Sequence, residues 1–353
     1  MSQNVCTING REIAFAAGST ISEAARENGI WIPTLCHLRG TTPTGACRIC
    51  VVEVEGARTL PAACVTPAEP SMIVRTESRQ VVKSRRMTLE LLLASGHHDC
   101  LLCDANGDCR LQDLAYRYQV SGRSFARSAG QYPLEDVNPL IVRDPSKCIL
   151  CGRCVQACNE IQANQAISMG YRGVSSKIVA AGDRPLKDSD CVFCGECVQA
   201  CPVGALVEKK NRAGARPWET TKVRTTCPYC GVGCQLWLHV KDGRIAKATG
   251  VEGAEPNWGR LCVKGRFGYD FIHSPERLTS PLIRRDDGGF REASWDEALD
   301  LVAARFATII REHGPDALAG VSCARSINED SYQMQKLFRS VFGTNNIDHC
   351  ART

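Results

Sequence analysis

Two runs of four cysteines with identical spacing lie between residues 148 and 202, and they constrain the chain more than any other feature. The first run is Cys148, Cys151, Cys154 and Cys158, and the second is Cys191, Cys194, Cys197 and Cys201, which Pro202 follows. Three thiolates separated by two residues each can hold three corners of an iron–sulfur cube, and the fourth cysteine of the run then reaches across to the other cube. The spacing therefore predicts one [4Fe–4S] cluster on Cys148, Cys151, Cys154 and Cys201, and a second on Cys191, Cys194, Cys197 and Cys158.

Zinc and disulfide bonds are the alternatives for such cysteines. A structural zinc takes four ligands, usually as two separated pairs, and has no use for a close-set quartet that is repeated. The chain has 22 cysteines in 353 residues, no N-terminal basic and apolar leader, and no apolar run of membrane-spanning length. A cysteine-rich protein of the reducing cytoplasm is expected to hold metal rather than disulfides. The pattern favours a two-cluster ferredoxin module that transfers electrons.

The formal net charge of +5 is small and spread along the chain. This charge pattern gives no indication of nucleic-acid binding.

The N-terminal segment predicts a hairpin, a helix and a second set of metal ligands. Residues 5–8 and 11–15 alternate in polarity around Asn9-Gly10, which is typical of a two-residue hairpin turn. Thr20, with Glu23 three residues later, predicts a helix that ends near Gly29, and a strand is predicted at residues 49–54. Four cysteines occupy the intervening loops: Cys36, Cys47, Cys50 and Cys64.

This arrangement resembles the β-grasp [2Fe–2S] ferredoxins. The ten-residue first gap differs from the plant-type gap of four and is similar to that of the large iron–sulfur subunit of respiratory complex I. The resemblance implies that the four cysteines hold one [2Fe–2S] cluster. Zinc is the alternative.

Residues 80–93 have apolar side chains at helical spacing, and Gly96 is expected to end the helix. The cysteines that follow, Cys100, Cys103 and Cys109, resemble those of a [4Fe–4S] cluster that complex I relatives hold with three cysteines and one histidine. That family places its histidine four residues before the first cysteine, where this chain has Gly96. The resemblance therefore implies His97 as the fourth ligand, with His98 as the alternative. Residues 121–139 have no periodicity and predict a connector.

A different cysteine spacing follows a basic segment at residues 209–226, which is predicted to be a linker. Cys227, Cys230, Cys234 and Cys262 resemble the N-terminal [4Fe–4S] domain of molybdenum- or tungsten-pterin oxidoreductases. Lys264 falls where that family places a lysine between cluster and pterin, and its charge would stabilise an electron in transit. A solvated surface lysine is the alternative for this residue.

The remaining residues predict an α/β arrangement. Ser294 and Glu297 predict a helix over residues 295–313 that Gly314 ends, residues 317–322 form a short apolar strand, and Asn328 begins a helix through residue 342. Strand, loop and helix in this order are half of a parallel-sheet unit. The stretch from Ser322 to Arg352 resembles the opening of the pterin-binding domain of formate dehydrogenases.

Taken together, the chain is similar to the N-terminal part of the catalytic alpha subunit of cytoplasmic, NAD-linked formate dehydrogenases. The expected fold class is a multi-domain α+β iron–sulfur protein. The expected domains are a β-grasp [2Fe–2S] domain (1–78), a His/Cys3 [4Fe–4S] domain (79–120), a two-[4Fe–4S] ferredoxin domain (139–210), a molybdopterin-oxidoreductase [4Fe–4S] domain (221–276) and the start of an α/β pterin-binding domain (277–353). Three of the 22 cysteines have no ligand role in this scheme: Cys6 and Cys323, expected to pack in apolar strands, and Cys350.

The resemblance implies that the full subunit oxidises formate at a molybdenum or tungsten bis-pterin guanine dinucleotide centre. Electrons would pass through one [2Fe–2S] and four [4Fe–4S] clusters to a flavin-containing, NADH dehydrogenase-like partner. The sequence leaves open which metal is used and whether ferredoxin is a second partner. The 353 residues alone are expected to lack formate oxidation, because one strand–helix unit cannot form a pterin pocket.

Three other interpretations fit the sequence less well. The large iron–sulfur subunit of complex I itself is not expected to carry the complete double ferredoxin run. An iron-only hydrogenase would have its own catalytic cysteines after Cys201. A stand-alone electron-transfer subunit of an NADH-linked hydrogenase or complex I-like assembly would not need the α/β segment at its C-terminal end.

The final residues carry one more expectation. In similar formate dehydrogenases, Cys-Ala-Arg and one variable residue precede a metal-binding cysteine or selenocysteine, and Cys350-Ala351-Arg352-Thr353 fills these four places. Because a cut here would leave apolar faces of an α/β domain uncovered, we expect a selenocysteine codon to follow codon 353. A UGA codon followed by a histidine codon, a long open frame and a selenocysteine-insertion hairpin would support this expectation.

Overall fold

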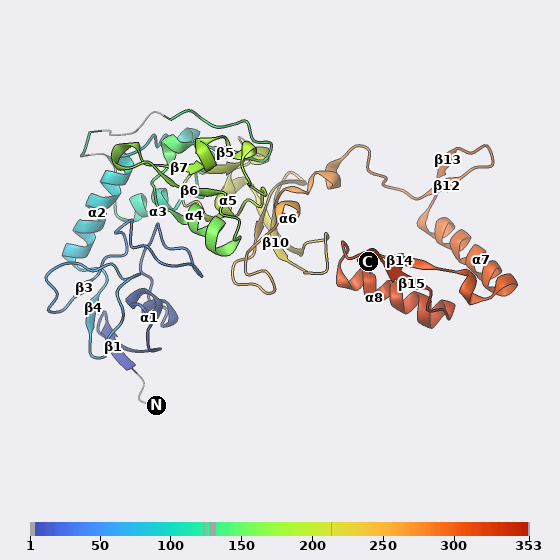
Figure 1. The fold of residues 1–353 in the computed structure, drawn as a ribbon, viewed down its shortest axis with the longest axis horizontal. Helices are drawn as coiled ribbons and strands as arrows, with labels where there is room; N and C mark the ends of the chain where they lie inside the picture. Colours follow the sequence, from blue (N-terminus) through green and yellow to red (C-terminus); the bar gives the residue numbers. More distant parts are fainter. Residues whose placement is uncertain (1–3, 123, 127–131, 213, 352–353) are drawn as a thin grey trace. The chain divides into compact units, whose positions relative to one another are not determined.

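The computed structural model describes residues 4–122, 124–126, 132–212 and 214–351, and its contacts divide the chain into two compact units, 1–220 and 221–353. The strands of the first unit are β1 (Asn4–Ile8), β2 (Arg11–Phe15), β3 (Glu53–Val54), β4 (Ile73–Arg75), β5 (Ile141–Arg143), β6 (Ile167–Gly170), β7 (Lys177–Ala180) and β8 (Leu206–Glu208). Its α-helices are α1 (Ile21–Glu27), α2 (Arg79–Ala94), α3 (Arg110–Arg117), α4 (Arg153–Gln156) and α5 (Glu196–Ala200) (Figure 1). The first three expected domains lie in this unit.

The N-terminal sheet has the strand order β2-β1-β4-β3, with β1 and β4 parallel and the two outer pairs antiparallel. The predicted hairpin is confirmed: Asn9 and Gly10 both have positive φ, at 52° and 78°, as a type I′ turn requires. The predicted helix cap is also present, because the side chains of Thr20 and Glu23 each accept a hydrogen bond from the other residue's backbone N–H. The buried core of this domain lies between the sheet and α1.

The strand expected at residues 49–54 is limited to Glu53–Val54, and of the four residues before it only Val51 pairs, in an isolated bridge to Ala62. The carbonyls of Ile49 and Val51 instead accept hydrogen bonds of 2.9 Å each from the guanidinium of Arg85 on α2. The Arg85 side chain is fully buried, and it also donates to the hydroxyl of Tyr118. A buried arginine from a distant helix therefore satisfies backbone groups that a neighbouring strand would otherwise bind.

Two short antiparallel pairs shape the region that contains the repeated quartets. β5 pairs with β8, and β6 pairs with β7 in a hairpin inserted between the two cysteine runs. The pairing of Arg143 with Leu206 brings the chain before the first quartet next to the chain after the second. The connector expected at residues 121–139 lies partly outside the described residues, and its described part contains no helix or strand.

The second unit contains β9 (Thr221–Thr226), β10 (Gln235–Lys241), β11 (Arg244–Gly250), β12 (Leu282–Arg284), β13 (Phe290–Glu292), β14 (Gly320–Ser322), β15 (Ile347–His349), α6 (Val263–Phe267), α7 (Trp295–His313) and α8 (Asn328–Lys336). The linker expected at residues 209–226 is wrong at its end, because β9 pairs along its length with β10, which also pairs with β11. β9 is an edge strand, and most of its side chains are exposed. An edge strand of this kind carries no apolar alternation, so the sequence pattern does not reveal it.

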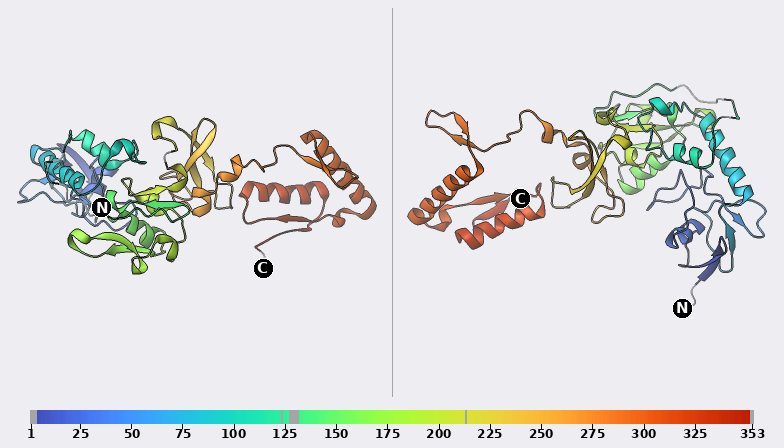
Figure 2. Two further views of the ribbon diagram at one scale, coloured as in Figure 1. Left: turned by 90° about the horizontal axis from the view of Figure 1, so that it is seen from above. Right: turned by 180° about the vertical axis from the view of Figure 1, so that it is seen from behind.

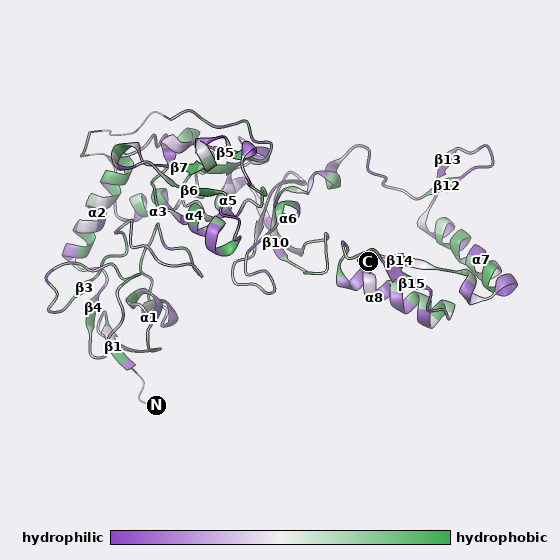
Figure 3. Ribbon diagram, viewed as in Figure 1, coloured by the Kyte–Doolittle hydropathy of each residue, from purple (hydrophilic) through white to green (hydrophobic). Residues whose placement is uncertain are grey.

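The C-terminal segment forms the expected start of a parallel α/β arrangement. Ser294 caps α7 by accepting a hydrogen bond from the backbone N–H of Glu297, and the helix ends at Gly314, as predicted. The expected strand is limited to β14, which pairs in parallel with β15, a strand that the sequence pattern did not predict. The left view of Figure 2 shows these strands alongside α8. Hydrophobic residues along α7 appear green in Figure 3, and none of the residues of α7 is buried.

Among the described residues, no helix combines the length and the hydrophobicity that a membrane span requires.

Candidate iron–sulfur sites

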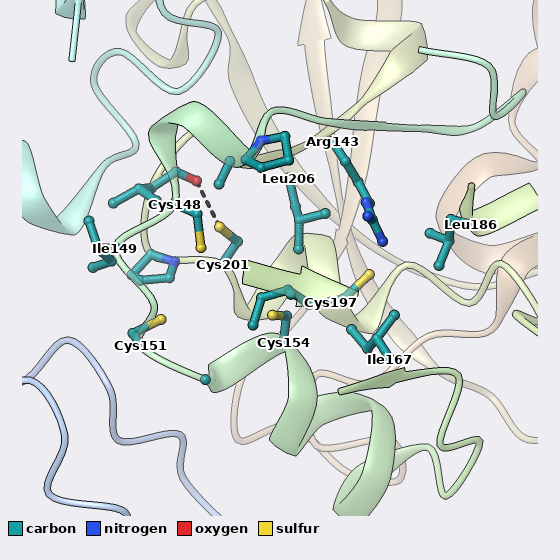
Figure 4. Close-up of a pocket in the computed structure, with 16 residues that line it drawn as sticks. Arg143, Cys148, Ile149, Cys151, Cys154, Ile167, Leu186, Cys197, Cys201 and Leu206 are labelled. Carbon is teal, nitrogen blue, oxygen red and sulfur yellow. Dashed lines mark hydrogen bonds between the residues drawn. The ribbon is translucent and has the colours of Figure 1, made fainter. Parts of the chain in front are cut away.

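One cavity in the first unit is lined by five of the predicted ligands: Cys148, Cys151, Cys154, Cys201 and Cys197 (Figure 4). The first four of these, three from the first run and one from the second, are the crosswise set that the spacing predicts for one cluster. The pairing of β5 with β8 explains this, because it returns the chain that follows Cys201 to the start of the first run. The rest of the lining is almost entirely apolar, as suits a buried cluster.

A second cavity is lined by the complementary set, Cys158, Cys191, Cys194 and Cys197. Cys197 lines the first cavity as well. Ile167 and Leu186 also line both cavities, so the two candidate sites share a wall, and the cysteine in that wall is a predicted ligand of the second site.

The two cysteine loops repeat the same backbone geometry. Leu150 and Phe193 both have a φ of 53°, and the glycines two residues later have φ values of 75° and 74°. The backbone N–H of Leu150 lies 3.4 Å from the sulfur of Cys148, and that of Phe193 lies 3.4 Å from the sulfur of Cys191. Positive φ costs a non-glycine residue about 1–2 kcal/mol. This conformation directs a backbone N–H at each ligand sulfur, and such hydrogen bonds stabilise thiolate ligands. The stabilisation explains why the strained conformation is present.

Burial makes the thiols of the first site difficult to ionise without a metal. It raises the pKa of Cys148 to about 11 and that of Cys151 to about 12. Only the thiolate binds iron, so loading a cluster would supply positive charge and release these protons. Convergent thiols, backbone donors to sulfur and an apolar cavity all fit an iron–sulfur cluster.

The N-terminal quartet also comes together. The sulfur atoms of Cys50 and Cys64 are 3.3 Å apart, and the backbone N–H of Cys47 lies 3.4 Å from the sulfur of Cys36. Hydrogen bonds from the thiols of Cys47 and Cys64 lower the pKa of Cys36 to about 2. All four predicted [2Fe–2S] ligands are therefore mutual neighbours.

The His/Cys3 candidates line a third cavity, of about 730 Å³, which includes Cys100, Cys103, Cys109 and both histidines. The imidazole Nε2 of His98 lies 3.1 Å from the carbonyl oxygen of Leu92, at the end of α2. The backbone N–H of His97 donates to the carbonyl of Ser146, at 2.9 Å. The cavity thus admits either histidine, and the choice of His97 as ligand stays a prediction.

Val203 and Gly204 lie where this third cavity meets the first. A Cβ added at Gly204 would lie 2.5 Å from the sulfur of Cys103, so the backbone passes too close for any other residue to fit without a shift. The preceding residue, Val203, lines both the first and the third cavity. Three of the candidate sites therefore stand in series, joined by Val203 on one side and by Cys197 on the other. Sequence spacing contained no signal for either contact.

In the second unit, burial raises the pKa of Cys227 and of Cys234, and the nearby sulfurs of Cys230 and Cys262 add to this rise. The backbone N–H of Cys227 donates to the carbonyl of Cys234, at 2.8 Å, which closes the loop. Lys264 is exposed on α6, two residues after Cys262. The side chain of Asn328, at the start of α8, donates to the carbonyl of Gly231 at 2.7 Å, so the cysteine loop and the α/β segment are in contact.

The three remaining cysteines behave differently from one another. Cys6 is buried in β1, as expected. The expectation that Cys323 packs within a strand is wrong, because it lies one residue beyond β14 and its sulfur is 3.5 Å from that of Cys350. The parallel register of β14 and β15 places the two cysteines at adjacent strand ends.

Five family models match the chain and together cover most of it. They are described as a 2Fe-2S iron-sulfur cluster binding domain (5–79), the NADH-ubiquinone oxidoreductase-G iron-sulfur binding region (85–123), a 4Fe-4S dicluster domain (147–205), the molybdopterin oxidoreductase Fe4S4 domain (220–274) and molybdopterin oxidoreductase (277–353). The chain therefore carries the iron–sulfur domains of molybdopterin oxidoreductases together with a region of the NADH-ubiquinone oxidoreductase type. It therefore combines [2Fe–2S] and [4Fe–4S] domains with the start of a molybdopterin domain in one α and β protein, as the sequence predicted.

Particular relatives come from several oxidoreductases. The chain is 40% identical over 346 residues to the alpha subunit of an NADPH-Fe(3+) oxidoreductase of Geobacter sulfurreducens, matching 98% of this chain and 40% of the relative. It is 37% identical to a subunit of an NADH-quinone oxidoreductase of Rhizobium meliloti, matching 98% of this chain and 40% of the relative. It is 35% identical to a putative formate dehydrogenase of Bacillus subtilis, matching 98% of this chain and 39% of the relative. The chain thus spans about 40% of the length of these curated relatives.

Among solved structures, a chain of an NAD+-reducing [NiFe]-hydrogenase in its H2-reduced state is similar, with a TM-score of 0.56 and 36% sequence identity. The match covers 59% of this chain and 88% of the hydrogenase chain.

Proposed function

We propose that the chain is the electron-transfer portion of a formate dehydrogenase alpha subunit. In this proposal the full subunit oxidises formate at a molybdenum or tungsten bis-pterin centre and delivers electrons to a flavin-containing partner that reduces NAD+. The chain's own part is to hold five centres: one [2Fe–2S] cluster on Cys36, Cys47, Cys50 and Cys64, and four [4Fe–4S] clusters on the other quartets. When bound, each cluster would supply one-electron transfer.

The observation that carries the electron-transfer role is the series arrangement of three sites in the first unit. The cavity with the His/Cys3 candidates shares Val203 with the first ferredoxin cavity, and that cavity shares Cys197 with the second. Walls this thin, with one shared residue at the first and three at the second, would keep neighbouring centres close. The [2Fe–2S] candidates Cys36 and Cys47 belong to the same hydrophobic core as Cys109, Cys148 and Cys201, which extends the series toward the N-terminal domain.

The formate assignment has narrower support. The match of residues 277–353 to molybdopterin oxidoreductases and the similarity to a putative formate dehydrogenase favour it. We assign to Lys264 a positive charge between the Cys227 site and the pterin, because that charge would stabilise the passing electron. The five domain boundaries, the cytoplasmic location and the selenocysteine after residue 353 stay predictions.

The test uses the full-length subunit with its flavin partner, purified without oxygen. Formate should reduce the iron–sulfur signals in electron paramagnetic resonance, and NADH should accumulate when NAD+ is added. The five clusters on residues 36–262 should account for about 18 irons. Full iron content with no reduction by formate would reject the formate assignment and leave the electron-transfer role standing.

A second function follows from a different observation. The similarity to a chain of an NAD+-reducing [NiFe]-hydrogenase, together with the NADPH-Fe(3+) oxidoreductase relative, favours an electron-transfer subunit in another pyridine-nucleotide-linked assembly. In that case NADH or NADPH, supplied through the flavin partner, should reduce the clusters, and formate should have no effect.

A further inference from the structure

Arg143 stands out among the residues of the first ferredoxin cavity, which Cys148, Cys151, Cys154 and Cys201 also line. It ends β5, and only 9% of its surface is exposed. Among the described residues that line the cavity, it is the one with a charged side chain. In Figure 4 the side chain points into the cavity on the side of Cys197, which also lines the second site.

The position of Arg143 is held from two sides. Its Nη2 forms an ion pair of 3.2 Å with Glu135, and the two residues also exchange backbone hydrogen bonds of 2.8 and 2.9 Å. Glu135 is held in turn, because its Oε1 accepts a 2.8 Å hydrogen bond from the backbone N–H of Leu186. The guanidinium is therefore fixed before any cluster binds.

The second terminal nitrogen of Arg143 is not satisfied by these contacts. Nη1 is buried and has no hydrogen-bond partner among the described residues. A buried N–H without an acceptor is costly, so such a group is expected to have a partner that the described residues do not supply. The thiolate and sulfide sulfurs of an iron–sulfur cluster are negatively charged acceptors, and the cavity is where they would lie.

We propose that Arg143 donates a hydrogen bond from Nη1 to a sulfur of the [4Fe–4S] centre held by Cys148, Cys151, Cys154 and Cys201, and thereby raises the reduction potential of that centre. The physical reason is that a fixed positive charge and a hydrogen bond to sulfur both stabilise the reduced form, which carries one more electron. Arg143 thus favours the electron on this centre through its charge and its hydrogen bond. The proposal rests on the proposed cluster occupancy of this cavity.

A purely structural role is the competing explanation, in which Arg143 serves only to anchor Glu135 and β5. The two explanations predict different directions for the shift in reduction potential in two variants. Arg143→Gln removes the positive charge, and Glu135→Gln removes the negative charge while keeping an oxygen that can accept from Leu186. If charge at the cavity sets the potential, the two variants must shift it in opposite directions. If the ion pair is only an anchor, both variants lose the same contact, and their reduction potentials cannot shift in opposite directions.

The experiment is an anaerobic redox titration of the full-length holoenzyme, followed by electron paramagnetic resonance, with iron content measured on each sample. For Arg143→Gln, one [4Fe–4S] signal should show an approximately tenfold lower ratio of reduced to oxidised centre at a fixed potential, which is a shift of about 59 mV for one electron. Glu135→Gln should shift the same signal upward. Arg143→Lys should recover part of the loss, because it restores the charge. The [2Fe–2S] signal serves as an internal reference and should not move.

Unchanged potentials with full iron content would overturn the proposal, as would shifts of the same sign in the two glutamine variants. Wild-type iron that is short by four atoms would instead count against cluster occupancy of the cavity, which is a failure of the proposed function. If Arg143→Gln does not retain the cluster, the Glu135→Gln variant decides: an upward shift supports the proposal, and no shift or a downward one rejects it.

Discussion

Replacing Gly204 with alanine tests whether Cys103 is held in place as a cluster ligand. The added methyl group would lie 2.5 Å from the sulfur of Cys103 and 3.2 Å from the Cβ of Ala105. Ordinary contacts between such atoms are about 3.5–4.0 Å, so the methyl overlaps the sulfur by roughly 1 Å. A free cysteine side chain could rotate away, whereas a sulfur bonded to iron cannot. Overpacking of this kind costs about 1–3 kcal/mol, which corresponds to a roughly 5- to 150-fold loss in cluster affinity.

The assay is the iron content and the electron paramagnetic resonance spectrum of the anaerobically purified full-length protein. Gly204→Ala should lose one [4Fe–4S] signal and about four irons while the [2Fe–2S] signal stays. Gly122→Ala is the matched control, because Gly122 lines the same cavity and an added Cβ there meets nothing within 4 Å. Retention of every signal and all the iron in Gly204→Ala would refute the argument that Cys103 is a fixed ligand at this point.

Three further predictions concern other parts of the chain. His97→Ala should alter one [4Fe–4S] signal in electron paramagnetic resonance and leave the others; the same change in His98→Ala instead would make His98 the ligand. The thiols of Cys323 and Cys350, 3.5 Å apart, should close to a disulfide when the cluster-loaded protein is treated with a small-molecule disulfide, and mass spectrometry of the alkylated protein should find no such bond in Cys323→Ser. Hydrogen bonds from the backbone and hydroxyl of the preceding N-cap threonine lower the pKa of Glu23. Its stabilisation is therefore present above about pH 4 and lost as the pH falls through that lowered pKa. Glu23→Ala should cost about 1 kcal/mol at pH 7 in thermal unfolding, and the difference from wild type should disappear in acid.

Local chemistry was sufficient to predict the features that depend on neighbours in the sequence. The turn at Asn9-Gly10 and the helix start at Ser294 were predictable because dihedral preferences and capping bonds act over a few residues. Cysteine spacing indicated the quartets for a similar reason: ligands two residues apart can reach corners of one cluster. The crosswise exchange of Cys158 and Cys201 is likewise a prediction from spacing, because the fourth cysteine of such a run ligates the other cluster in two-cluster ferredoxins.

Only the tertiary structure decided the features that join distant segments. The sequence pattern at residues 49–54 is that of a strand, but the buried guanidinium of Arg85 donates hydrogen bonds to the carbonyls of Ile49 and Val51. The local sequence cannot indicate a hydrogen-bond partner on a distant helix. The pairing of β9, the approach of Cys323 to Cys350 and the orphaned Nη1 of Arg143 likewise depend on which strands become neighbours. The sequence by itself thus determined which residues could hold metal. The folded chain determined how the sites share walls and which charges face them, because distances and burial exist only once the segments have packed.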